Sequence, residues 1–201
     1  RNCRACESDK LDLFFSLKLS PIGDEFVSRD KLGIHQKKYP IDLYMCRDCN
    51  LFQLIDVISP EVLYGNYIYV SESSVGLKNH FNSFSKNIIQ DLNLKKDSLV
   101  VDIGSNDGIL LNFFKSSNMR VIGIEPAKDI AEIANKNGIK TFPDYLSKNT
   151  VDKILDEHGK AKVVTSNNVF ANVDEIRNWV LCVKDLLDND GVSTKSIEIF
   201  C

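Results

Sequence analysis

Residues 99–108 read Leu-Val-Val-Asp-Ile-Gly-Ser-Asn-Asp-Gly, an apolar run that ends in a polar, glycine-rich turn. The run Leu99 to Ile103 is almost continuously apolar, which is typical of a strand buried on both faces of a parallel sheet. The glycines at 104 and 108 mark a turn, and a helix through Phe114 is expected to follow. The stretch therefore predicts one strand–turn–helix unit of a layered α/β fold.

The same alternation continues along the chain. Apolar runs predict further strands at 121–125, 139–142 and 163–166, and helices are expected at 127–137, 150–158 and 174–187. A helix at 76–92, with apolar residues spaced by three and four, precedes them. Strands that alternate with helices imply right-handed crossovers and a parallel sheet covered on both faces. The predicted fold class is α/β, with a doubly wound, Rossmann-like sheet.

Unusual polar residues follow the predicted strands. In a doubly wound sheet the ligand lies beyond the carboxyl ends of the strands. Gly104 ends the first strand, where a missing side chain lets a nucleoside approach, and Asp102 and Asp107 flank it. Glu125 ends the second strand, 21 residues after Gly104, where a carboxylate can accept both hydroxyls of a ribose. Asn168 ends the fourth, where a side chain can face the reacting centre.

The turn itself discriminates between nucleoside cofactors. A dinucleotide fingerprint has glycines at three positions, which are occupied here by Gly104, Asn106 and Ile109, so the space for a pyrophosphate is lost. A P-loop sequence is absent from the chain. S-adenosylmethionine (SAM) carries no phosphate, so one glycine turn and the carboxylate of Glu125 are sufficient. The turn favours SAM over NAD, and a site for neither remains an alternative.

Four of the six cysteines form two CxxC pairs, Cys3 with Cys6 and Cys46 with Cys49. Two residues between thiolates allow a tight turn to present both sulfurs to one ion, and two such turns complete a tetrahedral zinc shell. Two disulfides or a redox-active CxxC are alternatives. Short apolar stretches at 11–19 and 39–45 predict strands between the pairs. A small zinc-binding β module is therefore expected, and in it the metal supplies folding free energy.

Composition limits the functional classes. The chain has 201 residues, 43% hydrophobic and 26% charged, with a net charge of −3. This balance is that of a soluble globular protein, and it argues against a nucleic-acid partner. No apolar run reaches the roughly 18 residues of a membrane span, and no leader opens the chain. We expect a cytoplasmic location and no membrane partner; the oligomeric state is left open.

The motifs in combination resemble the SAM-dependent sugar C-methyltransferases, which act on nucleotide-linked deoxysugars. The likeness runs from Cys3 to about Gly191 and rests on the two CxxC pairs and four further motifs: Y-x-Y-x-S at 67–71, V-D-I-G-S-N-D-G-I-L-L at 101–111, G-I-E-P-A at 123–127 and S-N-N-V-F-A at 166–171. It implies a class I SAM methyltransferase domain preceded by the zinc module. The implied boundaries are 1–58 for the zinc module, 59–96 for a Tyr/Ser-rich segment and helix over the substrate pocket, and 97–201 for the SAM-binding domain.

The resemblance also implies roles for individual residues. The zinc ligands are Cys3, Cys6, Cys46 and Cys49. The SAM site contains Gly104, Asn106, Asp107, Glu125 and Asn168, to which the position of Asp102 in its strand adds that residue. The candidate catalytic residues at the sugar pocket are Tyr67, Tyr69 and His80, and a packed or capping role is the alternative for His80. In the implied reaction a base removes the proton beside the ketone of a 4-keto nucleotide sugar, and the resulting carbanion takes the methyl group of SAM.

The chain departs from the family pattern in two places. Family members continue into a Y-x-E-H motif and a further domain, which these 201 residues lack, so the chain is expected to be a C-terminally truncated form with little or no turnover. Asn172 also stands where the family has a histidine. A non-catalytic zinc- and SAM-binding fragment is therefore an alternative. A nucleic-acid methyltransferase is a weaker one, because the run Asn167 to Phe170 lacks the prolines of base-methylating enzymes.

Overall fold

The computed structural model describes residues 2–23, 27–64, 71 and 75–196. The chain folds as two compact units, an N-terminal unit (Arg1–Tyr67 with Asp174–Arg177) and a C-terminal unit (Ile68–Val173 with Asn178–Cys201). In the described part of the chain, no helix combines the length and the apolar character that a bilayer span requires.

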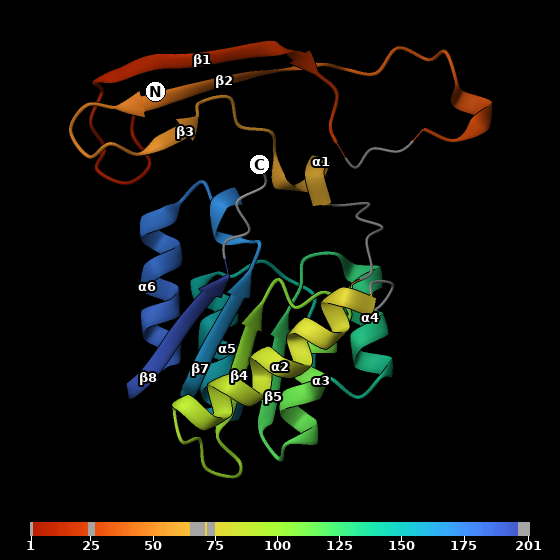
Figure 1. The fold of residues 1–201 in the computed structure, drawn as a ribbon, viewed down its shortest axis with the longest axis vertical. Coiled ribbons are helices and arrows are strands. Elements are labelled where there is room, and N and C mark those ends of the chain that lie inside the picture. The colour runs from red at the N-terminus through yellow and green to blue at the C-terminus, as the bar shows by residue number, and fades with distance from the viewer. Residues whose placement is uncertain (1, 24–26, 65–70, 72–74, 197–201) are drawn as a thin grey trace. The chain divides into compact units, whose positions relative to one another are not determined.

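The N-terminal unit contains an antiparallel sheet in the order β1-β2-β3 (Figure 1). Its elements are β1 (Leu11–Ser20), a 3-10 turn at Arg29–Lys31, β2 (Tyr39–Cys46), β3 (Phe52–Leu54) and the short helix α1 (Pro60–Tyr64). The first two strands match the predicted stretches, whereas β3 was not predicted. Among the residues of these three strands, all of which the structure describes, only Cys46 and Gln53 are buried. The sheet therefore has almost no apolar core of its own.

The C-terminal unit contains a five-stranded sheet in the order β6-β5-β4-β7-β8, with every described pair parallel. Its strands are β4 (Leu99–Ile103), β5 (Arg120–Ile124), β6 (Thr141–Phe142), β7 (Ala161–Asn167) and β8 (Leu187–Ser196), and its helices are α2 (Val75–Asp91), α3 (Ile109–Ser116), α4 (Lys128–Lys136), α5 (Lys148–His158) and α6 (Ile176–Leu186). The chain passes from β4 to β5 and β6 on one side, then returns to place β7 on the other. The order of strands thus switches between β4 and β7, and the predicted doubly wound sheet is confirmed.

Two apolar layers lie on opposite faces of this sheet. Successive residues of β4 point to opposite faces: Val100 packs with α2, α3 and α4, and Val101 packs with α5 and α6. Both valines are completely buried. Helices on both faces explain why the parallel strands read as continuous apolar runs in the sequence.

Strand β8 was not among the predicted strands, because Asn189, Asp190 and Gly191 read as a turn that closes the preceding helix. In the structure helix α6 ends at Leu186 and β8 starts at the next residue, pairing with β7 through a register shift between Ala161 and Val163. The pairing uses backbone groups, so an edge strand of this kind needs no apolar pattern. A side-chain pattern therefore gives little sign of it.

Candidate functional site

The four predicted zinc ligands come together in the N-terminal unit. The Sγ atoms of Cys3, Cys6, Cys46 and Cys49 all lie within 4.8 Å of one another. The sulfurs of Cys3 and Cys49 are 3.5 Å apart and those of Cys6 and Cys46 are 3.6 Å apart, so neither pair is bonded. Zinc–sulfur bonds of about 2.3 Å in a tetrahedron place the sulfurs about 3.8 Å from one another. The cluster thus fits a tetrahedral zinc ion and does not contain the alternative disulfides.

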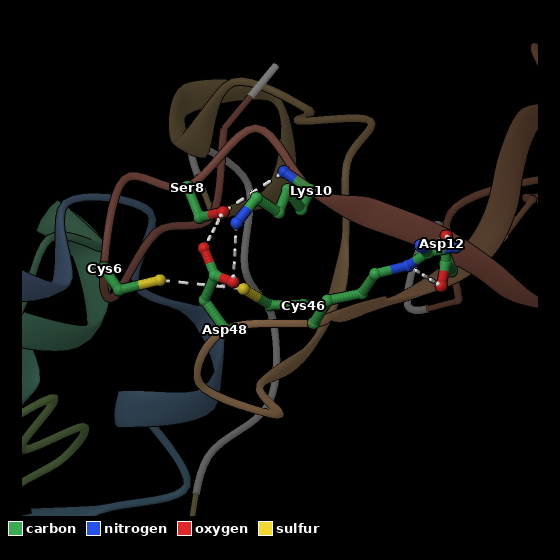
Figure 2. A network of polar contacts seen from close by, with 7 residues as sticks. Cys6, Ser8, Lys10, Asp12, Cys46 and Asp48 are labelled. Atoms are coloured by element: carbon green, nitrogen blue, oxygen red, sulfur yellow. Dashed lines mark hydrogen bonds and ion pairs between the residues drawn. The ribbon is translucent and has the colours of Figure 1, made fainter.

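The backbone around Cys46 favours the thiolate form of that one residue. Backbone N–H groups of Cys49 and Asp48 lower the pKa of the Cys46 thiol to about 7. Figure 2 shows how polar contacts hold the loop that carries Asp48: its carboxylate accepts hydrogen bonds from the Ser8 hydroxyl at 2.7 Å and the Lys10 ammonium at 3.2 Å. Arg47 donates to Asp12 of β1 at 2.7 Å. These contacts hold the second CxxC turn, which contains Arg47 and Asp48, against the residues that follow the first.

In the C-terminal unit, the glycine turn follows β4 at the carboxyl end of the sheet. Gly104 has a φ of +70°, and its N–H donates to the carbonyl of Ile124 at 2.8 Å. A Cβ atom on Gly104 would lie 2.4 Å from Cγ2 of Val169, in the loop after β7. The lack of a side chain at 104 thus allows the two loops at the strand switch to pack together, in addition to the role expected for it beside a ligand.

Replacement of Gly104 by alanine is expected to destabilise the C-terminal unit by about 1–3 kcal/mol, because a positive φ and a close contact are combined there. Gly138→Ala is the matched control, since Gly138 has a φ of +78° but only the flexible end of Lys115 lies near its missing Cβ, at 3.3 Å. Urea unfolding followed by the fluorescence of the single tryptophan, Trp179, measures both variants. An equal loss in the two would contradict a contribution from Val169.

Glu125 lies directly after β5, and its buried carboxylate holds the turn. One oxygen accepts the N–H of Asn106 and the other accepts the N–H of Ala127, both at 2.9 Å. Burial raises the pKa of Glu125, and the two N–H groups oppose that rise. A carboxylate oxygen can accept more than one hydrogen bond, so these contacts orient Glu125 and leave acceptor capacity toward a ligand.

Asn106 and Asp107 form the tip of the turn. Asn106 has a φ of +50°, a conformation that asparagine tolerates better than most residues. Its side-chain oxygen accepts the N–H groups of Asp107 and Ser71, each at 2.9 Å. The carboxylate of Asp107 accepts the N–H of Ile109 at 3.2 Å, at the start of α3. Both side chains therefore shape the turn.

Asp102 is buried at the centre of the sheet, next to the strand switch. The hydroxyl of Thr165 on β7 donates to its carboxylate at 2.6 Å. Burial raises the pKa of Asp102 to about 7, a rise that the Thr165 hydrogen bond opposes and the charge of Glu125 strengthens. A carboxyl group that can hold a proton near neutral pH thus lies beneath the glycine turn.

Of the remaining predicted residues, the structure describes Asn168 and His80. Asn168 follows β7 with a φ of +56°, and its carbonyl accepts the amide of Asn172 at 3.3 Å. His80 is exposed on α2, and its ring stacks on Phe84 with centroids 5.9 Å apart. Tyr67 and Tyr69 lie outside the described residues. The carboxyl ends of β4, β5 and β7 thus carry Asp102, Gly104, Asn106, Asp107, Glu125 and Asn168.

Sequence reasoning missed three contributors to this site: Thr165, Val169 and Ser71. Thr165 lies inside an apolar run, where a threonine is unremarkable in a strand. Each of the three contacts a predicted site residue that lies more than 30 positions away in the sequence. Ser71 and Val169 fall within the quoted motifs, but the sequence does not show which residues they contact, because these contacts depend on the tertiary fold.

Two family models match the chain. One described as "Putative zinc binding domain" matches residues 3–64, and one described as "Methyltransferase domain" matches residues 79–194. The first match includes all four clustered cysteines, and the second includes the glycine turn, Glu125 and Asn168.

Among curated proteins, the chain is similar to C-methyltransferase NovU of Streptomyces niveus, with 30% identity over 190 residues. The alignment covers 94% of this chain and 45% of that protein, so the chain spans less than half the length of this relative.

Among solved structures, the chain is similar to a "putative s-adenosyl-l-methionine-dependent methyltransferase" of Methanococcus maripaludis, with 16% identity, a TM-score of 0.50 and coverage of 65% of this chain and 64% of that one. It also matches magnesium protoporphyrin IX methyltransferase (ChlM) of Synechocystis PCC 6803, a structure with bound SAM, at 17% identity, a TM-score of 0.46 and 61% coverage of both chains. The first of these likenesses supports a shared fold.

Proposed function

The chain belongs to the methyltransferase domain family, whose model covers more than half of its length, and from this premise we propose that it binds S-adenosylmethionine at the carboxyl ends of β4 and β5. The observation that carries the proposal is the buried carboxylate of Glu125, held by two backbone N–H groups beside a glycine turn with no space for a pyrophosphate. SAM supplies an electrophilic methyl group when it is bound. The chain's own residues contribute orientation and charge placement.

We propose further that the acceptor is the carbon next to the ketone of a nucleotide-linked 4-keto deoxysugar. The likeness to C-methyltransferase NovU supports transfer to carbon, and the order of motifs supports the sugar class. Tyr67, Tyr69 and His80 are the proposed acceptor-side residues, of which one removes the proton from the sugar carbon. Asn168, at the end of β7, is proposed to face the reacting carbon.

The zinc cluster has a structural part in this proposal. Cys3, Cys6, Cys46 and Cys49 hold the ion, and four thiolates leave no open position for a substrate. The zinc cluster is therefore given no part in the methyl transfer itself.

Titration of the chain with S-adenosylhomocysteine, the product of methyl donation, tests the cofactor proposal. Saturable binding is expected by calorimetry, and Glu125→Ala is expected to weaken it by about 1.5–3 kcal/mol, because charge-assisted hydrogen bonds to the ribose are lost. Glu132→Ala is the matched control, since it removes an exposed carboxylate from α4. An affinity unchanged by Glu125→Ala would overturn the ribose assignment.

The acceptor proposal has a separate test. The 201 residues lack a Y-x-E-H motif, so we expect binding of the product without appreciable methyl transfer to a 4-keto nucleotide sugar. Incubation with SAM labelled in its methyl group, followed by analysis of the sugar, measures the transfer. The same assay on a longer chain that carries a Y-x-E-H motif is expected to give a C-methylated sugar. Methylation of an oxygen or nitrogen atom would contradict the proposed reaction.

A further inference from the structure

One side chain at the tip of the glycine turn joins two distant parts of the C-terminal unit. The side-chain oxygen of Asn106 accepts the N–H of Ser71 at 2.9 Å, 35 residues earlier in the sequence, as well as the N–H of Asp107. Ser71 is itself buried. An amide oxygen has two lone pairs, so both contacts can form together.

The backbone of Asn106 is held as well as its side chain. Its own backbone N–H donates to Glu125 at 2.9 Å, and its φ is +50°. Position 106 therefore requires a residue that tolerates a left-handed backbone and carries an acceptor two bonds beyond Cβ. Asparagine and aspartate meet both conditions, whereas glycine meets only the first.

We propose that Asn106 is a positioning residue that couples the methyl-donor site to the segment at Ser71, so that occupancy of the donor site tightens the attachment of Ser71. The inference rests on the proposed function, because Asn106 donates its N–H to Glu125 and follows Gly104 by two residues, and both are proposed contacts of the donor. A ligand that restrains the turn restrains the oxygen to which the Ser71 N–H is bound. By linkage, loss of the Ser71 attachment weakens donor binding by the same factor.

The coupling has a consequence for the order of binding. Ser71 lies two positions after Tyr69 and four after Tyr67, the proposed acceptor-side tyrosines. Attachment of Ser71 to the donor turn therefore anchors the chain two residues from the nearer tyrosine in the sequence. Donor binding is expected to precede productive binding of the sugar.

Hydrogen exchange of the Ser71 amide, measured by NMR on the 201-residue chain, tests the attachment directly. In the ligand-free chain, Asn106→Gly removes the acceptor and is expected to speed exchange roughly 2–10-fold, the factor that one hydrogen bond provides. Asn106→Asp keeps both the acceptor and the backbone conformation, and is expected to leave exchange close to that of the unaltered chain. The Gly138 amide, bonded to the Asn135 carbonyl elsewhere in the unit, reports any general loss of stability.

Addition of saturating S-adenosylhomocysteine tests the coupling. Exchange at Ser71 is expected to slow further in the unaltered chain and in Asn106→Asp, and to stay fast in Asn106→Gly, which should also bind the compound more weakly. Binding by calorimetry with no change at Ser71 would overturn the coupling and leave the proposed function standing. Failure to bind in all three chains would overturn the proposed function and the coupling with it. Equal exchange in Asn106→Gly and the unaltered chain would overturn the attachment itself.

Discussion

Replacement of Cys46 by serine is expected to abolish tight zinc binding and to unfold the N-terminal unit. The three strands of that unit bury only Cys46 and Gln53, so apolar burial cannot offset the conformational entropy of ordering the chain. A structural zinc ion contributes on the order of 10 kcal/mol at neutral pH. The metal content of the purified chain and the amide dispersion of residues 2–64 measure the effect, and a strong chelator should reproduce it.

The fluorescence of the single tryptophan reports whether the C-terminal unit stays folded in this variant. Trp179 lies in the C-terminal unit and is 7% exposed, so its fluorescence should stay native when the zinc site is lost. Cys182→Ala, which removes a thiol from α6, should keep the full metal content. A full zinc load in Cys46→Ser would disprove the four-cysteine site.

The stability of the C-terminal unit is expected to fall as the pH rises from about 4 to about 7. Asp102 has a pKa raised from 3.8 to about 7 by burial, so the folded state holds a proton that the unfolded state releases over this range. The favourable contribution of this protonated carboxyl to the free energy of unfolding is complete below the pKa of the unfolded state, 3.8. It is lost as the pH rises through the pKa of the folded state, about 7. The slope is at most about 1.4 kcal/mol per pH unit.

Asp102→Asn should flatten this dependence and stabilise the unit at pH 7.5. The amide oxygen can still accept the Thr165 hydroxyl, and no charge needs to be buried. Part of the slope should remain, because burial also raises the pKa of Glu125. Urea unfolding followed by Trp179 fluorescence at several pH values gives the slope, with Asp156→Asn on the exposed face of α5 as the control. A slope unchanged by Asp102→Asn would show that this carboxyl stays ionised.

The parts of the fold that the sequence predicts are those governed by local rules. Apolar runs locate β4, β5 and β7 within a few residues, since strands buried on both faces leave a continuous pattern. The predicted helix at 174–187 becomes α6 at Ile176–Leu186, and its apolar spacing accounts for the agreement. The edge strand β8 and the three-residue β3 pair mainly through backbone groups, so the side-chain pattern gives little sign of them.

The candidate site also contains residues that the local sequence predicts and contacts that it does not. The CxxC spacing alone predicts that the four cysteines share one site, because two such turns supply the four sulfurs of a tetrahedral zinc shell. The identities of Gly104 and Glu125 mark the cofactor side, since their residue types are tied to a turn and a strand end. The contacts of Asn106 with Ser71, of Thr165 with Asp102 and of Val169 with Gly104 depend on which strands become neighbours. That information is tertiary, and a single sequence does not display it.

The strand order also determines when this protein can fold during synthesis. Val100 of β4 pairs with Val163 of β7, so the central strand waits for a neighbour made more than 60 residues later. At about 5–20 residues per second, the ribosome exposes the open side of β4 for several seconds. All four clustered cysteines are made well before that and can take up zinc while β7 is still unmade. We therefore expect the nascent chain to be most prone to aggregation after β6 has emerged, and co-expression with a chaperone should raise the soluble yield more than added zinc does.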